Sequence, residues 1–291
     1  MVAEPLLNFL NGLIMPIVRL QRKKIIEITQ QSSSIFGTGG IGDVLLNPTP
    51  VLRPYGGYPI RHLMYYLCPI GDWRPVVHQM LDRIGQFNGK KILFIGYTDL
   101  CQIAHVLSVV GKHFDEVLLG ANIKELREVI GWLPCLERLV SNDPRSIIFT
   151  AHAKGITHKD NTVIQKWTRE MYEICLDYPK AIESSLERFA MCGAFRRVGQ
   201  FPDKPNTVSC LEAPRIWHYS GSFYWMRACR LFERDWRNVD FAWYGSESYP
   251  GKIFQQNECE CFVGDMCSDL YRQATWDTLL PKIEKWKQSQ R

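Results

Sequence analysis

The feature that most constrains this chain is an alternation of apolar strand segments and amphipathic helical segments between residues 58 and 155. Strand segments of the kind found buried in parallel sheets lie at residues 61–69, 90–97, 115–120 and 146–155. Helical patterns separate them, at residues 72–89, 99–110 and 122–140. Strands that alternate with helices across short connections predict a mostly parallel sheet with helices on both faces. The predicted fold class is therefore α/β.

The helical segments carry recognisable start signals. Asp99 is predicted to cap a helix that runs through Val110. The clearest helix is predicted at residues 122–140, where Asn122 with Glu125 three residues later resembles a capping box. Pro134 predicts a kink within it.

The second half of the chain has a different pattern. Helices are predicted at 161–178, 182–189 and 276–287, an aromatic strand pair or one bent strand at 215–227, and a loop at 241–254. We predict an N-terminal extension and connector over residues 1–55, followed by a single domain over 56–291. Its first half is residues 56–158 and its second half is residues 159–291.

Composition limits the function classes. The chain has 291 residues, 46% hydrophobic and 22% charged, as in an ordinary globular protein. Its net charge of +5 is scattered along the chain, so we do not predict nucleic-acid binding. Most of the ten cysteines stand in apolar contexts and no secretory signal is convincing, which favours reduced thiols and a cytoplasmic location.

The apolar N-terminal segment, residues 6–20, raises the question of a membrane. It is interrupted by polar residues and proline, and it is shorter than the roughly 20 residues that a spanning helix needs. A helix packed on the domain is the favoured interpretation. The alternative is an interfacial helix that, with the basic cluster at 19–24, contacts the inner face of the membrane.

A glycine fingerprint, G-x-G-x-x-G, is formed by Gly37, Gly39 and Gly42. A dinucleotide site needs a strand before these glycines, a helix after them and an acid about 20 residues later. A polar stretch precedes them, prolines follow, and residues 59–67 contain no acid. We therefore predict a flexible connection, and an oxidoreductase is not supported.

Cysteines and acids are the candidate metal ligands of the chain. Cys259, Cys261 and Cys267 form a cluster, but no second C-x-x-C pair accompanies it and no histidine follows position 218. Buried thiols are favoured over zinc. Asp143 has no second acid two residues on and is predicted to cap the turn before Pro144. No metal ligand is predicted.

The sequence TAHAKGITH lies at the end of the fourth predicted strand. His152 and Lys154 point to the same side of an extended backbone, and Gly155 allows a sharp turn and a close backbone approach. A cation beside a histidine suits a phosphate or diphosphate. The alternative is a solvated Lys154 beside a hydrogen-bonded core histidine.

Two further segments offer a base and an aromatic surface. Glu247 lies in a glycine-rich loop among aromatic residues, which would raise its pKa and suit a general base; the alternative is an ordinary exposed glutamate. The run WHYSGSFYW is either sheet filling or a surface that stacks on a sugar ring. The candidate sugar contacts there are His218, Gly221, Tyr224 and Trp225.

The order of a parallel nucleotide-binding half, then AHAKGIT, WHYSGSFYW and WYGSESYPG, resembles a family of bacterial-type glycosyltransferases with the GT-A fold. The resemblance covers residues 53–276. It implies that the first-half strands bind a sugar nucleotide, that the second half binds the acceptor, and that Glu247 matches the catalytic carboxylate. The D-x-D metal motif typical of the fold is missing, and HAKG stands near its expected place. The resemblance then gives His152 and Lys154 the task of neutralising the leaving diphosphate, although a divalent metal stays open.

The function predicted on these grounds is a hexosyltransferase-type glycosyltransferase in polysaccharide biosynthesis. Its partners are a nucleotide-diphosphate sugar and a glycan or other hydroxyl acceptor. The alternative is a non-catalytic carbohydrate-binding or assembly protein on the same scaffold, in which the aromatic residues matter and Glu247 does not.

Overall fold

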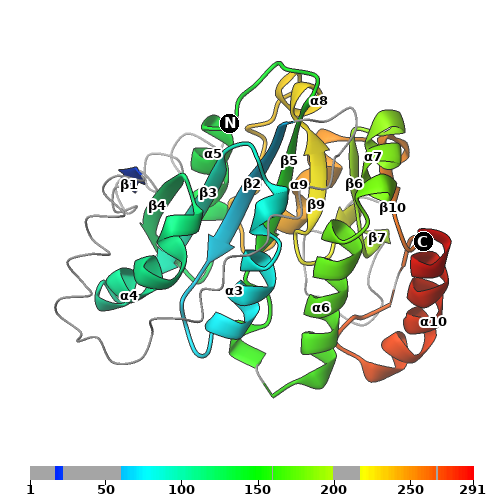
Figure 1. Cartoon of the computed structure of the whole chain (residues 1–291), viewed down its shortest axis with the longest axis horizontal. Helices are drawn as coiled ribbons and strands as arrows, with labels where there is room; N and C mark the ends of the chain where they lie inside the picture. Colours follow the sequence, from blue (N-terminus) through cyan, green and yellow to red (C-terminus); the bar gives the residue numbers. More distant parts are fainter. Residues whose placement is uncertain (1–16, 22–59, 159, 199–216, 267) are drawn as a thin grey trace.

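The computed structural model describes residues 17–21, 60–158, 160–198, 217–266 and 268–291 (Figure 1). An eight-stranded mixed sheet runs through it in the order β1-β4-β3-β2-β5-β9-β6-β10, and β7 pairs with β8 separately. The strands are β1 Val18–Gln21, β2 Ile60–Leu67, β3 Lys91–Tyr97, β4 Glu116–Ala121, β5 Ser146–His152, β6 Met191–Gly193, β7 Arg196–Val198, β8 Trp217–Tyr219, β9 Tyr224–Arg227 and β10 Cys259–Cys261.

The predicted α/β class is confirmed. Strands β4, β3, β2 and β5 are mutually parallel, and β6 is parallel to β10. Strand β9 lies antiparallel between β5 and β6, and β1 adds antiparallel to β4 at one edge. Central strands such as β3 are buried along most of their length, which explains their continuous apolar sequence.

Helices cover both faces of the sheet (Figure 1). Side chains of α3, α4, α6, α7 and α10 join the core on one face, and those of α5, α8 and α9 join the core on the other. The helices are α3 Arg74–Leu81, α4 Cys101–Val110, α5 Val129–Glu137, α6 Thr162–Leu176, α7 Pro179–Arg188, α8 Ala228–Phe232, α9 Gly245–Ile253 and α10 Gln273–Ser289.

The predicted starts of two helices can be compared with the structure. The Asp99 side chain accepts a hydrogen bond from the N–H of Cys101, the first residue of α4, over 2.9 Å, but the N-cap position is Leu100, one residue later than predicted. The predicted capping box at Asn122 is wrong, because α5 begins only at Val129. Arg127 has φ +48°, a left-handed conformation that interrupts a helix. The Asn122 side chain instead accepts a hydrogen bond from a tyrosine of β2.

Residues 241–254, predicted as a loop, contain helix α9. Its two glycines permit close backbone contact: a Cβ on Gly245 would lie 1.9 Å from the carbonyl oxygen of Asp240, and one on Gly251 would lie 2.2 Å from that of Trp217. Pro250 lies inside the helix and has no N–H to donate to the carbonyl of Ser246. Tertiary contacts therefore stabilise a helix that its local sequence disfavours.

The aromatic segment 215–227 forms two strands that belong to different sheets. Strand β8 pairs with β7, whereas β9 lies inside the main sheet. Between them Gly221 has φ +86° and Ser222 has φ +57°, so the chain turns sharply. The turn sends β9 into the core and leaves β8 against α9.

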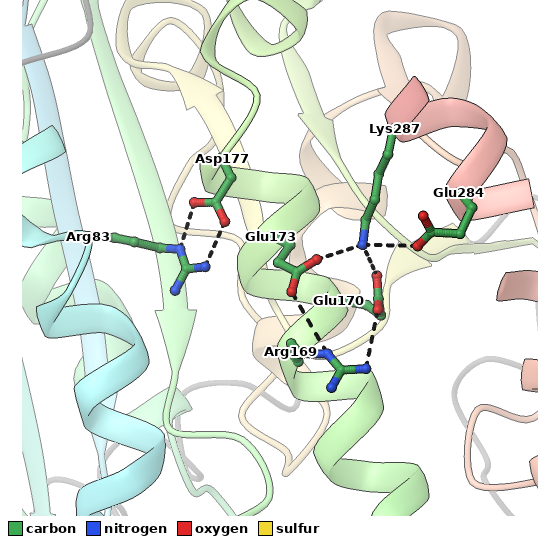
Figure 2. Close-up of polar contacts among 7 residues, drawn as sticks. All are labelled: Arg83, Arg169, Glu170, Glu173, Asp177, Glu284 and Lys287. Atoms are coloured by element: carbon green, nitrogen blue, oxygen red, sulfur yellow. Dashed lines mark hydrogen bonds and ion pairs between the residues drawn. The ribbon is translucent and has the colours of Figure 1, made fainter. Parts of the chain in front are cut away.

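Helix α6 is held on two sides by ion pairs (Figure 2). Lys287 of α10 lies 2.8 Å from Glu170 and 2.6 Å from Glu173, and its side chain is only 8% exposed. At the end of α6, Arg83 contacts Asp177 at 2.7 Å. These contacts fix a helix that lines the cavity described below.

Several predictions fall on residues outside the described part of the chain, among them the fingerprint glycines Gly37, Gly39 and Gly42. Of the N-terminal segment predicted as a helix, residues 18–21 are the strand β1, and Arg19 pairs with Glu116 of β4 at 2.7 Å. Across the described ranges, no helix has the length and apolar character needed to cross a membrane.

Candidate functional site

A cavity of about 640 Å³ opens at the carboxyl ends of β2 and β5. The strand order reverses at this point, because β3 and β4 extend to one side of β2 and β5 lies on the other. Open α/β sheets bind ligands at such a switch point. The charged, histidine and asparagine residues that line it are Asn122, Lys124, Arg127, Glu128, His152, Lys154, His158, Arg197, His218, Glu247 and Asp269.

The end of β5 delivers the predicted HAKG residues to this cavity. His152, Lys154 and Gly155 all line it, but β5 ends at His152 and Lys154 lies in the turn that follows, so the extended backbone predicted through Lys154 is wrong. Gly155 has φ +88°, and a Cβ there would lie 3.1 Å from Ile164 and 3.2 Å from Thr168. This glycine therefore makes the turn and lets the chain pack on α6.

The ammonium group of Lys154 lies against aromatic rings. Its Nζ is 4.0 Å from the ring centroid of Trp167 in α6 and 5.8 Å from that of Tyr271. The two rings meet edge to face with centroids 5.3 Å apart. Cation–π contact orients the ammonium without neutralising its charge. Lys154 thus remains a positive charge that an anion in the cavity can use.

Glu247 is the carboxylate of the first turn of α9. Its Oε1 accepts a hydrogen bond from the N–H of Gly221 over 2.7 Å. Burial raises its pKa, but the charge of Lys154, followed by His218, the Gly221 N–H and His152, outweighs that effect and holds the pKa below its ordinary value. The prediction that its neighbours raise this pKa is therefore wrong. Glu247 is ionised at neutral pH.

His218 of β8 lies beside this carboxylate. It is 6% exposed, and burial lowers its pKa to about 4, although Glu247 acts in the opposite direction. The imidazole is therefore neutral at neutral pH. A neutral imidazole offers one donor and one acceptor nitrogen for hydrogen bonds.

Glu128, which the sequence did not single out, connects three parts of the site. Its Oε1 accepts a hydrogen bond from Ser246 Oγ at 2.9 Å and lies 3.5 Å from His152 Nδ1. Ser246 Oγ also contacts Ser222 Oγ at 3.0 Å. Glu128 thereby joins the turn before α5, the end of β5 and the start of α9. The sequence predicted a continuous helix over residues 122–140, so Glu128 was not recognised as a site residue. The turn at Arg127 depends on contacts with distant segments, which the local sequence does not show.

Three predicted sugar contacts do not reach the cavity. Gly221 acts through its backbone N–H on Glu247. Tyr224 and Trp225 are completely buried, and their polar atoms donate to the carbonyl of Ser246 at 3.0 Å and of Cys175 at 2.7 Å. The structure therefore places these two aromatic side chains in the core of the sheet, where a sugar cannot contact them.

The metal candidates of the sequence are Asp143 and the cysteine cluster. Asp143 accepts a hydrogen bond from the N–H of Arg145 at 2.9 Å and also pairs with its guanidinium group, as expected of a turn cap. Cys259 and Cys261 belong to strand β10 and are free thiols, whereas Cys267 lies outside the described residues. Within the described ranges, no group of three histidine, cysteine or acidic side chains fits a metal ion.

Comparison with known sequences identifies no relative: no protein-family model and no curated protein matches the chain. The geometry of the cavity must therefore carry the functional argument. It brings together a cation held by aromatic rings, an ionised carboxylate and a neutral imidazole at the switch point of an α/β sheet.

Proposed function

We propose that this protein is a glycosyltransferase that moves a sugar from a nucleoside-diphosphate donor to a hydroxyl acceptor. The observation that carries the proposal is the placement of Lys154 and Glu247 in one cavity at the switch point of the sheet. Displacement at an anomeric carbon needs positive charge at the leaving group and a proton acceptor at the incoming hydroxyl. Lys154 and Glu247 supply these two groups.

The donor fits the carboxyl ends of the parallel strands. The four parallel strands have the order β4-β3-β2-β5, in which β4, β3 and β2 match one mononucleotide-binding half and β5 lies across the switch point. As the C1–O bond breaks, its electron pair goes to the departing diphosphate, and Lys154 stabilises the negative charge that develops there. The exposed side chain of Lys124 adds further positive charge in the same cavity.

The acceptor fits the side of the cavity that holds Glu247. In a single inverting displacement the acceptor oxygen forms the new bond to C1, and its proton passes to the Glu247 carboxylate. Lys154 is the strongest charge that lowers the Glu247 pKa. A diphosphate bound to Lys154 offsets this charge, so donor binding raises the proton affinity of Glu247 at the moment when a base is needed.

The GT-A assignment belongs to this proposal. Parallel strands β2 to β5 would form the nucleotide half, and β8, the turn at Gly221 and α9 would form the acceptor half. A GT-A enzyme ordinarily uses a metal held by a D-x-D pair. Among the described residues the cavity acids do not gather into a metal-binding group, so we assign no step to a metal.

The test begins with binding. UDP, GDP, ADP and CDP, with their sugar conjugates, are screened for an increase in thermal midpoint, because a ligand that binds only the folded state must raise it. Lys154→Gln is expected to lower the affinity for any nucleoside diphosphate that responds in this screen by about tenfold or more, because a charge-assisted contact is lost. Lys112→Gln is the control, because Lys112 is exposed and does not line the cavity. No response to any of these compounds removes the proposal.

The second step tests turnover with a confirmed donor. Glu247→Gln preserves the hydrogen bond from Gly221 but cannot take a proton. We expect kcat to fall by about 10²- to 10⁴-fold with the donor affinity maintained. Unchanged turnover would exclude Glu247 as the base, and sugar binding without turnover in the natural protein would favour the non-catalytic carbohydrate-binding alternative.

A further inference from the structure

Two aromatic side chains of the cavity stand out by their exposure. Trp243 is 46% exposed and Tyr271 is 47% exposed, whereas Trp167 in the same cavity is 3% exposed. A large aromatic side chain left accessible on the wall of a cavity has its apolar face available to a ligand. Phe241, two residues before Trp243, is 41% exposed but does not line the cavity.

The ring of Trp243 is held in place by its neighbours. The guanidinium carbon of Arg127 lies 5.4 Å from its ring centroid, and Tyr244 meets it nearly edge to face, at 5.7 Å and 83°. Arg127 has φ +48°, which is uncommon for a residue with a side chain. Such backbone strain is characteristic of functional sites. Residues from two separate segments thus fix one exposed ring.

The two exposed rings belong to different parts of the proposed reaction. Tyr271 packs on Trp167 and lies within 5.8 Å of the Lys154 ammonium, so it accompanies the group that would hold the diphosphate. Trp243 precedes Glu247 by four residues in the segment that begins α9. The ring and the carboxylate therefore stand on one short stretch of chain and line the same cavity.

We infer that Trp243 is the platform on which a saccharide ring of the acceptor stacks, with one of its hydroxyl groups directed to Glu247. This inference rests on the proposed function and adds the acceptor class to it. A pyranose ring has an apolar C–H face that suits an aromatic surface, and hydroxyl groups around its edge that suit polar neighbours. Arg127 and Tyr244 provide hydrogen-bonding groups beside the ring.

The experiment compares Trp243→Ala with Phe241→Ala. Phe241 is a matched control, since it is an exposed aromatic residue of the same segment outside the cavity. Acceptors are the methyl glycosides of glucose, galactose, mannose and N-acetylglucosamine, tested with the donor that the nucleotide screen identifies. We expect Trp243→Ala to raise the acceptor KM about tenfold, from the contribution of one aromatic contact. Trp243→Phe should recover part of the loss, and Phe241→Ala should behave as the natural protein.

A nucleobase could also stack on an indole ring, so nucleoside-diphosphate binding is measured on the same variants by thermal shift. The inference expects an unchanged response to the diphosphate in Trp243→Ala. Weaker binding of the nucleoside diphosphate with an unchanged acceptor KM would show that the Trp243 ring contacts the nucleobase of the donor, and it would overturn the inference. An acceptor KM within about twofold of the natural value would overturn it while leaving the glycosyltransferase proposal intact.

A measurement of saccharide binding that needs no turnover tests the role of Trp243 independently of the proposed glycosyltransferase activity. The same methyl glycosides are tested by saturation-transfer NMR, with and without the nucleoside diphosphates. A signal that Trp243→Ala abolishes and Phe241→Ala retains supports the platform even when no donor reacts. No signal with the natural protein, or an equal signal in Trp243→Ala, refutes it.

Discussion

The carboxylate of Glu247 accepts a hydrogen bond from the backbone N–H of Gly221 over 2.7 Å. The turn between β8 and β9 therefore positions the proposed base, and its left-handed glycine is part of the site. Gly221 has φ +86°, and a Cβ there would lie 2.6 Å from the sulfur of Met171. The backbone geometry of this turn and the ionisation of Glu247 are thus coupled.

Gly221→Ala is expected to lower the free energy of unfolding by about 2–3 kcal/mol, because the left-handed conformation and the contact with Met171 both disfavour a side chain. Displacement of the Gly221 N–H also removes one cause of the lowered Glu247 pKa, so that pKa should rise. Urea unfolding and the pH dependence of turnover measure the two effects.

Gly264→Ala is the matched control for this substitution. Gly264 has φ +81°, but a Cβ there would meet nothing within 4 Å. Gly264→Ala should lower the free energy of unfolding by only about 1 kcal/mol, from backbone strain alone, and should leave the pH profile of turnover unchanged. Equal losses of stability in the two variants would show that the contact with Met171 does not matter, and an unchanged pH profile in Gly221→Ala would show that the Gly221 N–H does not lower the Glu247 pKa.

A second prediction concerns the hydroxyl of Tyr224. This buried group donates to the Ser246 carbonyl, which Pro250 leaves without its usual helical donor. Tyr224→Phe leaves that buried carbonyl unsatisfied and should destabilise the protein by about 1–3 kcal/mol. Chemical denaturation measures the change.

The double variant Tyr224→Phe/Pro250→Ala identifies the cause. Replacing the proline by alanine restores a backbone N–H four residues after Ser246, so the cost of losing the hydroxyl should largely disappear. If the stability changes of the two single substitutions simply add in the double variant, the Tyr224 hydroxyl does not substitute for the helical hydrogen bond.

The elements that the sequence predicted correctly are those whose signal is local or periodic. Strand β3 is a continuous apolar run because it is buried on both faces, and β5 ends at His152, so this residue and Lys154 of the following turn reach the cavity at the end of the strand. Their position at the switch point then follows from the parallel order of the strands.

The missed features depend on contacts between distant segments. Glycine, serine and proline make α9 look like a loop, and contacts with distant segments, such as the Tyr224 hydroxyl and the closely packed Trp217 backbone, explain why it is a helix. In the sequence, Trp225 cannot be distinguished from an aromatic residue that binds a sugar, but in the structure its neighbours bury it completely. The role of Glu128 was hidden because the turn at Arg127 interrupts an otherwise regular helical pattern.

A third prediction concerns acid sensitivity. His218 has an ordinary pKa of 6.5 in the unfolded chain and about 4 in the folded protein, because burial disfavours the charged imidazole. Between these values the unfolded chain binds a proton that the folded protein does not, so the stability falls as the pH falls through this window. The total loss should be about 3 kcal/mol.

Urea unfolding at pH 7 and pH 4.5 checks this expectation. His218→Gln cannot titrate and should lose about 2 kcal/mol less than the natural protein between these pH values. His158→Gln is the control, since His158 is an exposed histidine of the same cavity. An identical pH dependence in all three proteins would mean that His218 accepts its proton in the folded state as readily as in the unfolded chain.

The last prediction concerns the ion pairs that join α10 to α6 (Figure 2). Lys287 lies 2.8 Å from Glu170, whose side chain is 3% exposed, so Lys287→Met leaves a buried carboxylate without its closest cation. Destabilisation of about 3 kcal/mol is expected, because the remaining cation, Arg169, lies 3.7 Å from Glu170 and is 58% exposed, so it compensates the buried charge only in part. Guanidinium unfolding monitored by circular dichroism measures it.

Two further variants show whether charge burial is the cause. Lys285→Met changes an exposed lysine of the same helix and should alter stability by less than about 0.5 kcal/mol. Adding Glu170→Gln to Lys287→Met removes the orphaned charge, so the double variant should regain at least half of the loss. No recovery in the double variant would indicate that the aliphatic stem of Lys287, rather than its charge, holds α10 on α6.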